Sequence, residues 1–212
     1  MVKLSSTEEE NTEFLSSLWD SYKYLILLGI VLVGGGIIGW ESWSKATTSK
    51  LQGASDLYEN FIISVNDPKE DEKIIAREIV QIYPDSLYAD LVTFHIAKFH
   101  VDQNDLEEAE KHLEWILERH SSRWGSDFNP IEVTARLRLA RVLIANNNPS
   151  RALEIIDQSN NMDGSLYEVK GDAEELLGQF AQARLSYVLA IESTQNPSIQ
   201  ALLKMKLADL ET

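Results

Sequence analysis

The chain has 212 residues, of which 34 are acidic and 19 basic, so its formal net charge is -15. This length suits one modest domain with appendages better than two large domains, and the excess of acid disfavours nucleic acid as a partner because no clustered basic surface is present to neutralise phosphates. The sequence has no cysteine, which excludes disulfides, thiol catalysis and cysteine-based metal sites but does not indicate a redox compartment.

An uncharged run, YLILLGIVLVGGGIIGW, extends from Tyr24 to Trp40. As a helix it would be roughly 25 Å long, close to the lower limit for a bilayer hydrocarbon core of about 30 Å. Trp19 and Tyr22 precede the run and Trp43 follows it, a placement typical of aromatic residues at the two membrane interfaces. A buried strand would be shorter and less symmetrically flanked. The sequence therefore predicts a short polar segment over residues 1–22 and a transmembrane helix over residues 23–43.

The residues around the run favour an uncleaved anchor over a cleaved signal peptide. A signal peptide normally begins with basic residues, whereas acidic residues dominate the segment before this run. Ser44-Lys45-Ala46 is a poor small-x-small cleavage site. The bases nearest the run are Lys3 and Lys23 on one side and Lys45 and Lys50 on the other, so the positive-inside rule leaves the orientation open.

Glycines are frequent within the predicted span, and two interpretations of them stay open. Gly35 and Gly39 form a small-xxx-small pair that would let another transmembrane helix approach closely. Glycine is also common in membrane spans without any partner helix.

Residues 44–84 predict a connecting helix and a degenerate first helical pair. Apolar or small side chains recur at three- and four-residue spacing from Leu51 to Val65, which is the period of an amphipathic helix. A second helix is expected to begin behind Asp67-Pro68 and to end at Pro84.

Residues 85–212 contain an internal repeat marked by small residues twelve positions apart. The three pairs are Ala97 and Ala109, Ala140 and Ala152, and Gly171 and Ala183. A short polar turn separates the members of each pair, and a bulky residue stands four positions after the second member: Leu113, Ile156 and Tyr187. Two antiparallel helices approach closely only where small residues face each other.

This spacing resembles the tetratricopeptide repeat. It predicts an all-α fold in which a single N-terminal transmembrane helix precedes a tetratricopeptide-repeat-like helical solenoid, closed by a capping helix with apolar residues from Ile199 to Leu207. The small residues are 43 and then 31 positions apart instead of 34, and the excess falls in the loop SSRWGSDFNP.

The sequence predicts no catalytic residue, no metal site and no cofactor. The four histidines, at positions 95, 100, 112 and 120, lack the three- or four-residue spacing that places two metal ligands on one helix face, and they are interpreted as surface or groove residues. Acidic clusters such as EEE at 8–10 and KEDEK at 69–73 are interpreted as solvated helix surface. No glycine-rich phosphate loop, GxSxG or HExxH motif is present. An enzyme is therefore disfavoured relative to a binding protein.

In a tetratricopeptide array, the first helix of each pair lines a concave face through its second, fifth, ninth and twelfth positions. Those positions hold Leu91, Phe94, Lys98 and Val101 in the first pair, Thr134, Leu137, Arg141 and Ile144 in the second, and Ser165, Glu168, Asp172 and Glu175 in the third. The face would change from apolar and basic to acidic, and it would suit a polypeptide segment. The alternative is that its apolar members are packed by neighbouring helices.

The chain resembles the bacterial YfgM family, the ancillary subunits of the SecYEG translocon. The resemblance rests on GWESW at the end of the span, ASDLYENFIISV, NDLEEAEKHLE, the run ARLRLARVLIANNNPSRALEIID and the MKLADL tail, with LRLARV the most specific segment. The acidic EEENTE and the loop SSRWGSDFNP depart from the family.

The resemblance implies a single-pass protein of the bacterial inner membrane, with its N-terminus in the cytoplasm and its repeats in the periplasm. The implied partners are SecYEG, the chaperone PpiD and translocating polypeptides, with a further link to the response regulator RcsB. The preferred hypothesis is therefore a translocon-associated scaffold. A cytosol-facing adaptor or regulator of a stress response is the alternative, because the flanking bases permit either orientation.

Overall fold

The computed structural model describes residues 6–65, 71–121 and 128–210. These residues form α-helices joined by short turns, and no strand occurs among them, which confirms the all-α prediction. The chain divides into two compact units, Met1–Gly53 and Ala54–Thr212. Each is described by itself.

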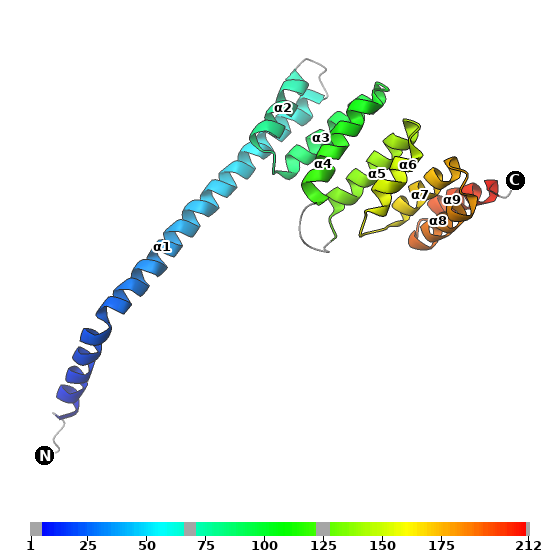
Figure 1. The fold of residues 1–212 in the computed structure, drawn as a ribbon. Helices are drawn as coiled ribbons and strands as arrows, with labels where there is room; N and C mark the ends of the chain where they lie inside the picture. Colours follow the sequence, from blue (N-terminus) through cyan, green and yellow to red (C-terminus); the bar gives the residue numbers. More distant parts are fainter. Residues whose placement is uncertain (1–5, 66–70, 122–127, 211–212) are drawn as a thin grey trace. The chain divides into compact units, whose positions relative to one another are not determined.

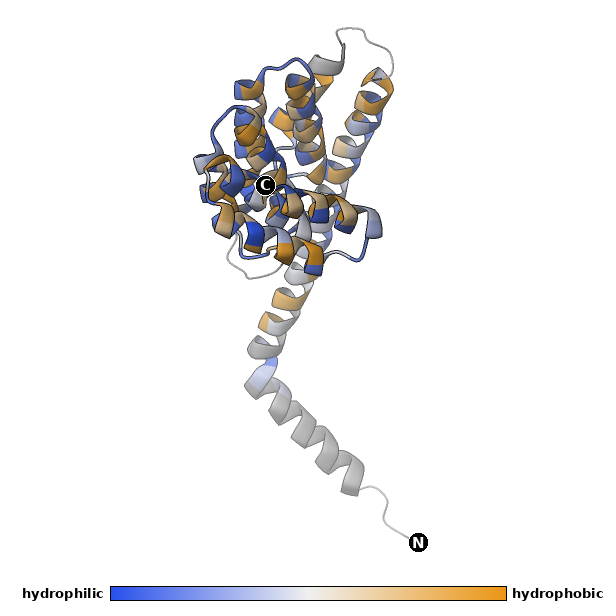
Figure 2. Ribbon diagram, turned by 90° about the vertical axis from the view of Figure 1, so that its right-hand side faces the viewer, coloured by the Kyte–Doolittle hydropathy of each residue, from blue (hydrophilic) through white to orange (hydrophobic). Residues whose placement is uncertain are grey.

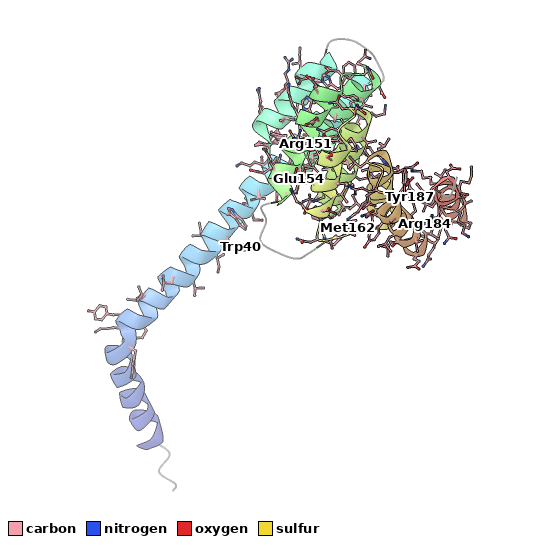
Figure 3. All side chains as sticks on the ribbon, turned by 45° about the vertical axis from the view of Figure 1, so that its right-hand side comes forward. Trp40, Arg151, Glu154, Met162, Arg184 and Tyr187 are labelled. Carbon is pink, nitrogen blue, oxygen red and sulfur yellow. The ribbon has the colours of Figure 1, made fainter. Side chains whose placement is uncertain are left out.

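The first unit consists of most of helix α1, which runs from Ser6 to Val65 (Figure 1). From Tyr22 onward this helix is long and apolar enough to cross a membrane. Its large apolar side chains are exposed: Leu32 is 67%, Ile38 70% and Trp40 69% accessible, and Trp40 extends outward from the ribbon in Figure 3. Exposing so much apolar surface to water is unfavourable, whereas a bilayer would cover it. The predicted apolar N-terminal helix is confirmed.

The second unit begins with the end of α1 and continues as a row of helices, each of which packs mainly on its neighbours in the chain (Figure 1). The helices are α2 (Asp71–Ile82), α3 (Leu87–Asp102), α4 (Leu106–Ser121), α5 (Pro130–Ala145), α6 (Pro149–Asp157), α7 (Gly164–Leu176), α8 (Phe180–Ser193) and α9 (Pro197–Asp209). Figure 2 shows polar and apolar residues on different sides of these helices, with polar turns between them. This is the pattern of helices that pack in layers.

The small residues of the three repeats lie where the paired helices meet. Every member of the three pairs is buried, from Ala97 and Ala109 in the first pair to Gly171 and Ala183 in the last. The bulky residues that follow them are almost completely buried: Leu113 is 1% accessible, and Ile156 and Tyr187 are 0%. The tetratricopeptide-like repeat predicted from the spacing is therefore confirmed.

The same turn joins the two helices of each pair. Asn104, Asn147 and Gly178 have positive φ angles of 60°, 60° and 73°, the left-handed conformation that ends many helices. The residue after each donates its backbone N–H to a carbonyl five positions earlier, at 2.8 Å in all three turns. This repeated hydrogen bond reverses the chain in the same way each time. Glycine and asparagine adopt this conformation at the lowest cost.

Side-chain caps and prolines define where several helices begin. Asn129, Asn148 and Asn196 each accept backbone N–H bonds at the start of α5, α6 and α9, and a proline follows each of them. Proline fits the first helical turn because its missing N–H would have no helical partner there. Pro197 therefore marks the start of α9.

The end of α1 packs on α2 and α3 through a small hydrophobic cluster. Phe61 of α1 forms a hydrophobic cluster with Ala76 and Ile79 of α2 and with Ala89 and Val92 of α3.

Two features of the sequence fall largely outside the part of the chain that the structure describes. Most of the loop SSRWGSDFNP lies in residues 122–127, and the side chains of the acidic clusters at 8–10 and 69–73 lie outside the described residues.

Candidate functional site

A groove of about 310 Å³ lies between α3, α4 and α5, and we call it the basic groove. It brings together four of the residues predicted for the concave face: Phe94, Lys98, Val101 and Arg141. The side chains of Ala97, Leu113, Arg138 and Val142 complete its lining. Since it joins two consecutive repeats, it exists only when the repeats stack as they do here.

The basic groove has an apolar floor bordered by three cationic side chains. Phe94 is 6% accessible and forms part of the main hydrophobic core, so its ring is held in place. The guanidinium of Arg138 lies 4.6 Å from the centroid of that ring, a distance typical of a cation–π contact. Lys98 pairs with Asp102 one helical turn away, at 2.5 Å. The groove therefore combines apolar and basic surface in a strongly acidic protein.

Four other predicted residues of the concave face have structural roles or stand apart from the groove. Leu137 and Ile144 pack against the main core, which agrees with the alternative that neighbouring helices cover them. Thr134 donates its hydroxyl hydrogen bond to the carbonyl of Pro130, at 2.7 Å, within its own helix. Leu91 is half-buried and does not line the basic groove.

The acidic residues predicted for the third repeat are bound by other side chains of the protein. Lys206 of α9 donates hydrogen bonds to Glu168 at 3.0 Å and to Asp172 at 2.7 Å. The Tyr187 hydroxyl contacts Asp172 at 2.8 Å and Glu175 at 2.7 Å. Ser165 is half-buried near the start of α7. The acidic end of the predicted face is therefore largely engaged in joining α7 to α8 and α9.

These contacts change the protonation equilibria of Lys206 and Tyr187. Burial would lower the pKa of Lys206, but the hydrogen bonds to Asp172 and Glu168 outweigh it, and the pKa is raised above its ordinary value. Burial raises the pKa of the Tyr187 hydroxyl, and the hydrogen bonds to Glu175 and Asp172 act in the same direction. Both groups keep their protons at neutral pH, so Lys206 remains a cation and Tyr187 remains a donor.

The sequence pattern missed three residues that shape this face: Arg138, Lys206 and Tyr187. Arg138 does not stand at a standard concave position, and Lys206 comes from the capping helix. Tyr187 was identified as a bulky packing residue, but its hydroxyl could not be paired with Asp172 without the helix register. The surplus of acid on α7 was the available signal, because several neighbouring carboxylates require a cation or donor when they are half-buried.

The prediction that the histidines are surface or groove residues is wrong for His120. His120 is largely buried, and its Nε2 lies 2.9 Å from Asp90 Oδ2. Asn129 Nδ2 lies 3.1 Å from His120 Nδ1, so this polar cluster connects α3, the end of α4 and the start of α5. Arg136 has a similar structural role, because its guanidinium bonds Glu132 and the carbonyl of Ile155 on α6.

Among the side chains the structure describes, no group of three histidine or carboxylate residues is arranged to hold a metal ion. In the predicted span, a Cβ added at Gly35 or Gly39 would meet no atom within 4 Å, so no other part of the described protein packs against these two glycines.

The comparison with protein families covers most of the chain. The model of the tetratricopeptide repeat-like domain matches residues 16–212. The chain belongs to this family. The match includes the apolar part of α1 as well as the helical repeats, so the tetratricopeptide repeat-like family describes both units.

Several curated relatives are similar to this tetratricopeptide repeat-like protein over nearly their full length, and each is named ancillary SecYEG translocon subunit. The relative from Escherichia coli strain K12 is 25% identical over 211 residues, which is 99% of both chains. The relative from Neisseria gonorrhoeae is 24% identical over 96% of this chain and 97% of its own, and the one from Haemophilus influenzae is 24% identical over 97% and 98%. The resemblance inferred from the sequence is confirmed.

Proposed function

We propose that this protein is a membrane-anchored scaffold that associates with the SecYEG translocon and presents its helical repeats to partner polypeptides. The observation that carries this proposal is the combination of an exposed apolar helix with a groove formed between stacked repeats. The full-length similarity to proteins named ancillary SecYEG translocon subunit supports the choice of partner.

The proposed division of the chain follows from the same features. Residues 1–22 form the N-terminal segment, 23–43 the membrane span, 44–84 the connecting helix with the degenerate pair, and 85–212 the repeats with their capping helix. In this proposal the protein crosses the bacterial inner membrane once, with its N-terminus in the cytoplasm and the repeats in the periplasm. Gly35 and Gly39 would provide the face on which another transmembrane helix packs.

The chemistry of the basic groove favours a polypeptide segment that carries an apolar side chain beside acidic ones. The apolar floor around Phe94 would bury the apolar side chain, and Lys98, Arg138 and Arg141 would attract the acids. The proposed partners are SecYEG, the chaperone PpiD and translocating polypeptides. A non-catalytic scaffold needs no cofactor for this role.

Site-specific crosslinking in native membranes tests the groove. A photoreactive residue at Val101, which is 39% accessible and lines the groove, should capture SecYEG, PpiD or a translocating chain. A photoreactive residue at the exposed Gln182 on α8 serves as the matched control. Arg138→Glu should weaken capture from Val101, since it reverses a charge at the groove, whereas Lys204→Glu on the surface of α9 should not. Equal capture from both positions, or none from either, would refute the proposed binding surface.

A protease-protection experiment tests the orientation separately. In spheroplasts, protease added outside should digest the repeats if they are periplasmic. Complete protection until the membrane is lysed would instead support the cytosol-facing adaptor or regulator.

A further inference from the structure

A second cavity, separate from the basic groove, lies between the end of α1 and helices α2, α3 and α4. Its volume is about 400 Å³, and we call it the histidine pocket. Phe61, Ile96 and Phe99 provide much of its apolar wall. This size and lining are typical of sites for small molecules or single side chains. The pocket uses different α3 side chains from the basic groove, so the two are distinct sites.

Three of the four histidines of the chain line this pocket, two on α3 and one on α4. The rings of His100 on α3 and His112 on α4 stack with centroids 5.4 Å apart and planes inclined by 25°. His95 meets the ring of Phe61 edge-on, with centroids 5.1 Å apart. Arg77 of α2 adds a guanidinium. Imidazole and guanidinium groups thus face one apolar cavity from three helices.

Two described carboxylates near the pocket are already paired. Asp105 Oδ2 lies 3.1 Å from His100 Nδ1, in the turn between α3 and α4. Glu108, which lines the pocket, accepts a hydrogen bond from Lys111 at 2.5 Å. Because this bond favours the ionised form, the pKa of Glu108 is lowered. A bound anion would therefore find a cationic partner in Arg77 and imidazoles that become cationic when protonated, beside two acids that are already paired.

We propose that the histidine pocket binds a carboxylate attached to an aromatic or branched apolar body, and that binding is accompanied by proton uptake at His112. The apolar body contacts Phe61, Ile96 and Phe99, while the carboxylate pairs with Arg77 and with the protonated imidazole of His112. Two kinds of ligand carry a carboxylate on an apolar body: a free organic acid, and the C-terminus of a polypeptide that ends in an apolar residue.

Burial and the nearby His100 lower the pKa of His112, so its imidazole is neutral at neutral pH in the free protein. Two ionised groups of its own helix, α4, also act on it: Glu108 favours the protonated form of His112 and Lys111 opposes it. Arg77 and His95 also line the pocket. A bound carboxylate favours the imidazolium, and by thermodynamic linkage a lower pH must then favour binding of the carboxylate.

Calorimetric titration of the full chain in lipid nanodiscs tests this proposal, with empty nanodiscs as the blank. The probe is N-acetylphenylalanine, and its amide is the uncharged control. The acid should bind roughly threefold to tenfold more tightly at pH 6 than at pH 8, because a rise of one unit in the pKa of His112 on binding corresponds to at most a tenfold change in affinity. The amide should bind more weakly than the acid at pH 6, with little pH dependence.

Substitutions in the histidine pocket test whether the pH-dependent binding of the acid arises there. His112→Phe retains a ring of similar size but removes the titrating group, so the ratio of affinities between pH 6 and pH 8 should fall to about one. Arg77→Met should weaken binding of the acid at both pH values, whereas Lys204→Met, on the surface of α9, should leave binding unchanged. Circular dichroism confirms that each variant is folded. Equal binding of acid and amide, no binding by the folded wild-type chain, or an unchanged pH ratio in His112→Phe would overturn the proposal.

A longer probe distinguishes the two sources of the carboxylate. An eight-residue peptide that ends in phenylalanine should match the affinity of N-acetylphenylalanine if the pocket receives polypeptide C-termini. Binding of the small acid alone would instead identify a free organic acid as the ligand, and both results support the shared chemistry.

Discussion

At Gly171 the two helices of the last repeat come so close that no side chain fits between them. A Cβ built on this residue would lie 2.5 Å from Cε1 and 2.6 Å from Cδ1 of Tyr187. The ring cannot easily move away, because its hydroxyl is held by Asp172 and Glu175. The contact links the smallest residue of the repeat pattern to one of its largest.

Gly171→Ala should therefore lower the free energy of unfolding by about 1–3 kcal/mol, the usual cost of overpacking a core. Urea denaturation followed by circular dichroism measures this change. Gln182→Ala, on the exposed side of α8, is the control and should change stability by less than about 0.5 kcal/mol. An unchanged urea midpoint for Gly171→Ala would show that the ring of Tyr187 yields.

His112 should make the stability of the repeats depend on pH. Because burial lowers the pKa of His112 in the folded state, the unfolded chain binds a proton more readily. The stability contributed by the neutral imidazole is present above about pH 6.5 and is lost as the pH falls through the lower folded-state pKa. Between pH 7.5 and pH 5.5, the urea midpoint of the wild-type chain should decrease more than that of His112→Phe. Parallel decreases in the two proteins would contradict this cause.

At this scale, the sequence predicted the residues whose size determines how closely helices pack, but it did not predict the charged residues whose partners lie on other helices. Ala97, Ala109 and Tyr187 could be assigned because helix spacing depends directly on side-chain volume. Arg138 and Lys206 could not, because their partners lie on other helices and are determined by packing. His100 and His112 also lie twelve residues apart, so the register of the small residues could have paired them.

At the scale of elements, α9 closes the last repeat with one side of the helix only. Leu203 is completely buried in a cluster with Ala183, Tyr187 and Ala190, and Leu207 packs beside it. Leu202 and Met205 remain 48% and 64% accessible. The apolar spacing of this segment predicted a helix, but it could not distinguish the covered side from the exposed side.

Leu203→Ala should cost about 2–5 kcal/mol, as expected when a buried leucine is truncated. Leu202→Ala makes the same chemical change at the adjacent, exposed position and should cost much less. In a repeat array each element depends mainly on its neighbours, so hydrogen exchange should increase in α7 and α8 of Leu203→Ala and remain unchanged in α3 and α4. Equal increases throughout the repeats would mean that they unfold as one unit.

At the scale of the whole molecule, the chain joins an apolar helix to a solenoid that has its own hydrophobic clusters. Both could be predicted from the sequence, because the uncharged run and the twelve-residue spacing are strong periodic signals. The orientation in the membrane could not, because the flanking lysines are balanced.

The full chain should remain with membranes after extraction at alkaline pH, whereas a chain that lacks residues 1–43 should be released and retain helical circular dichroism. The physical reason is that the apolar stretch of α1 is exposed at the side chains that the structure describes, while the repeats bury their own core. Retention of the truncated chain in the membrane pellet would place the main membrane contact in the repeats instead.

The most direct test of the central claim is purification of the full-length, anchored chain from native membranes in mild detergent, followed by identification of the proteins retained with it. The proposed role predicts that SecYEG is recovered with this chain and not with an unrelated single-span membrane protein purified in the same way. Recovery of the chain without SecYEG, or equal recovery of SecYEG with the control, would contradict it.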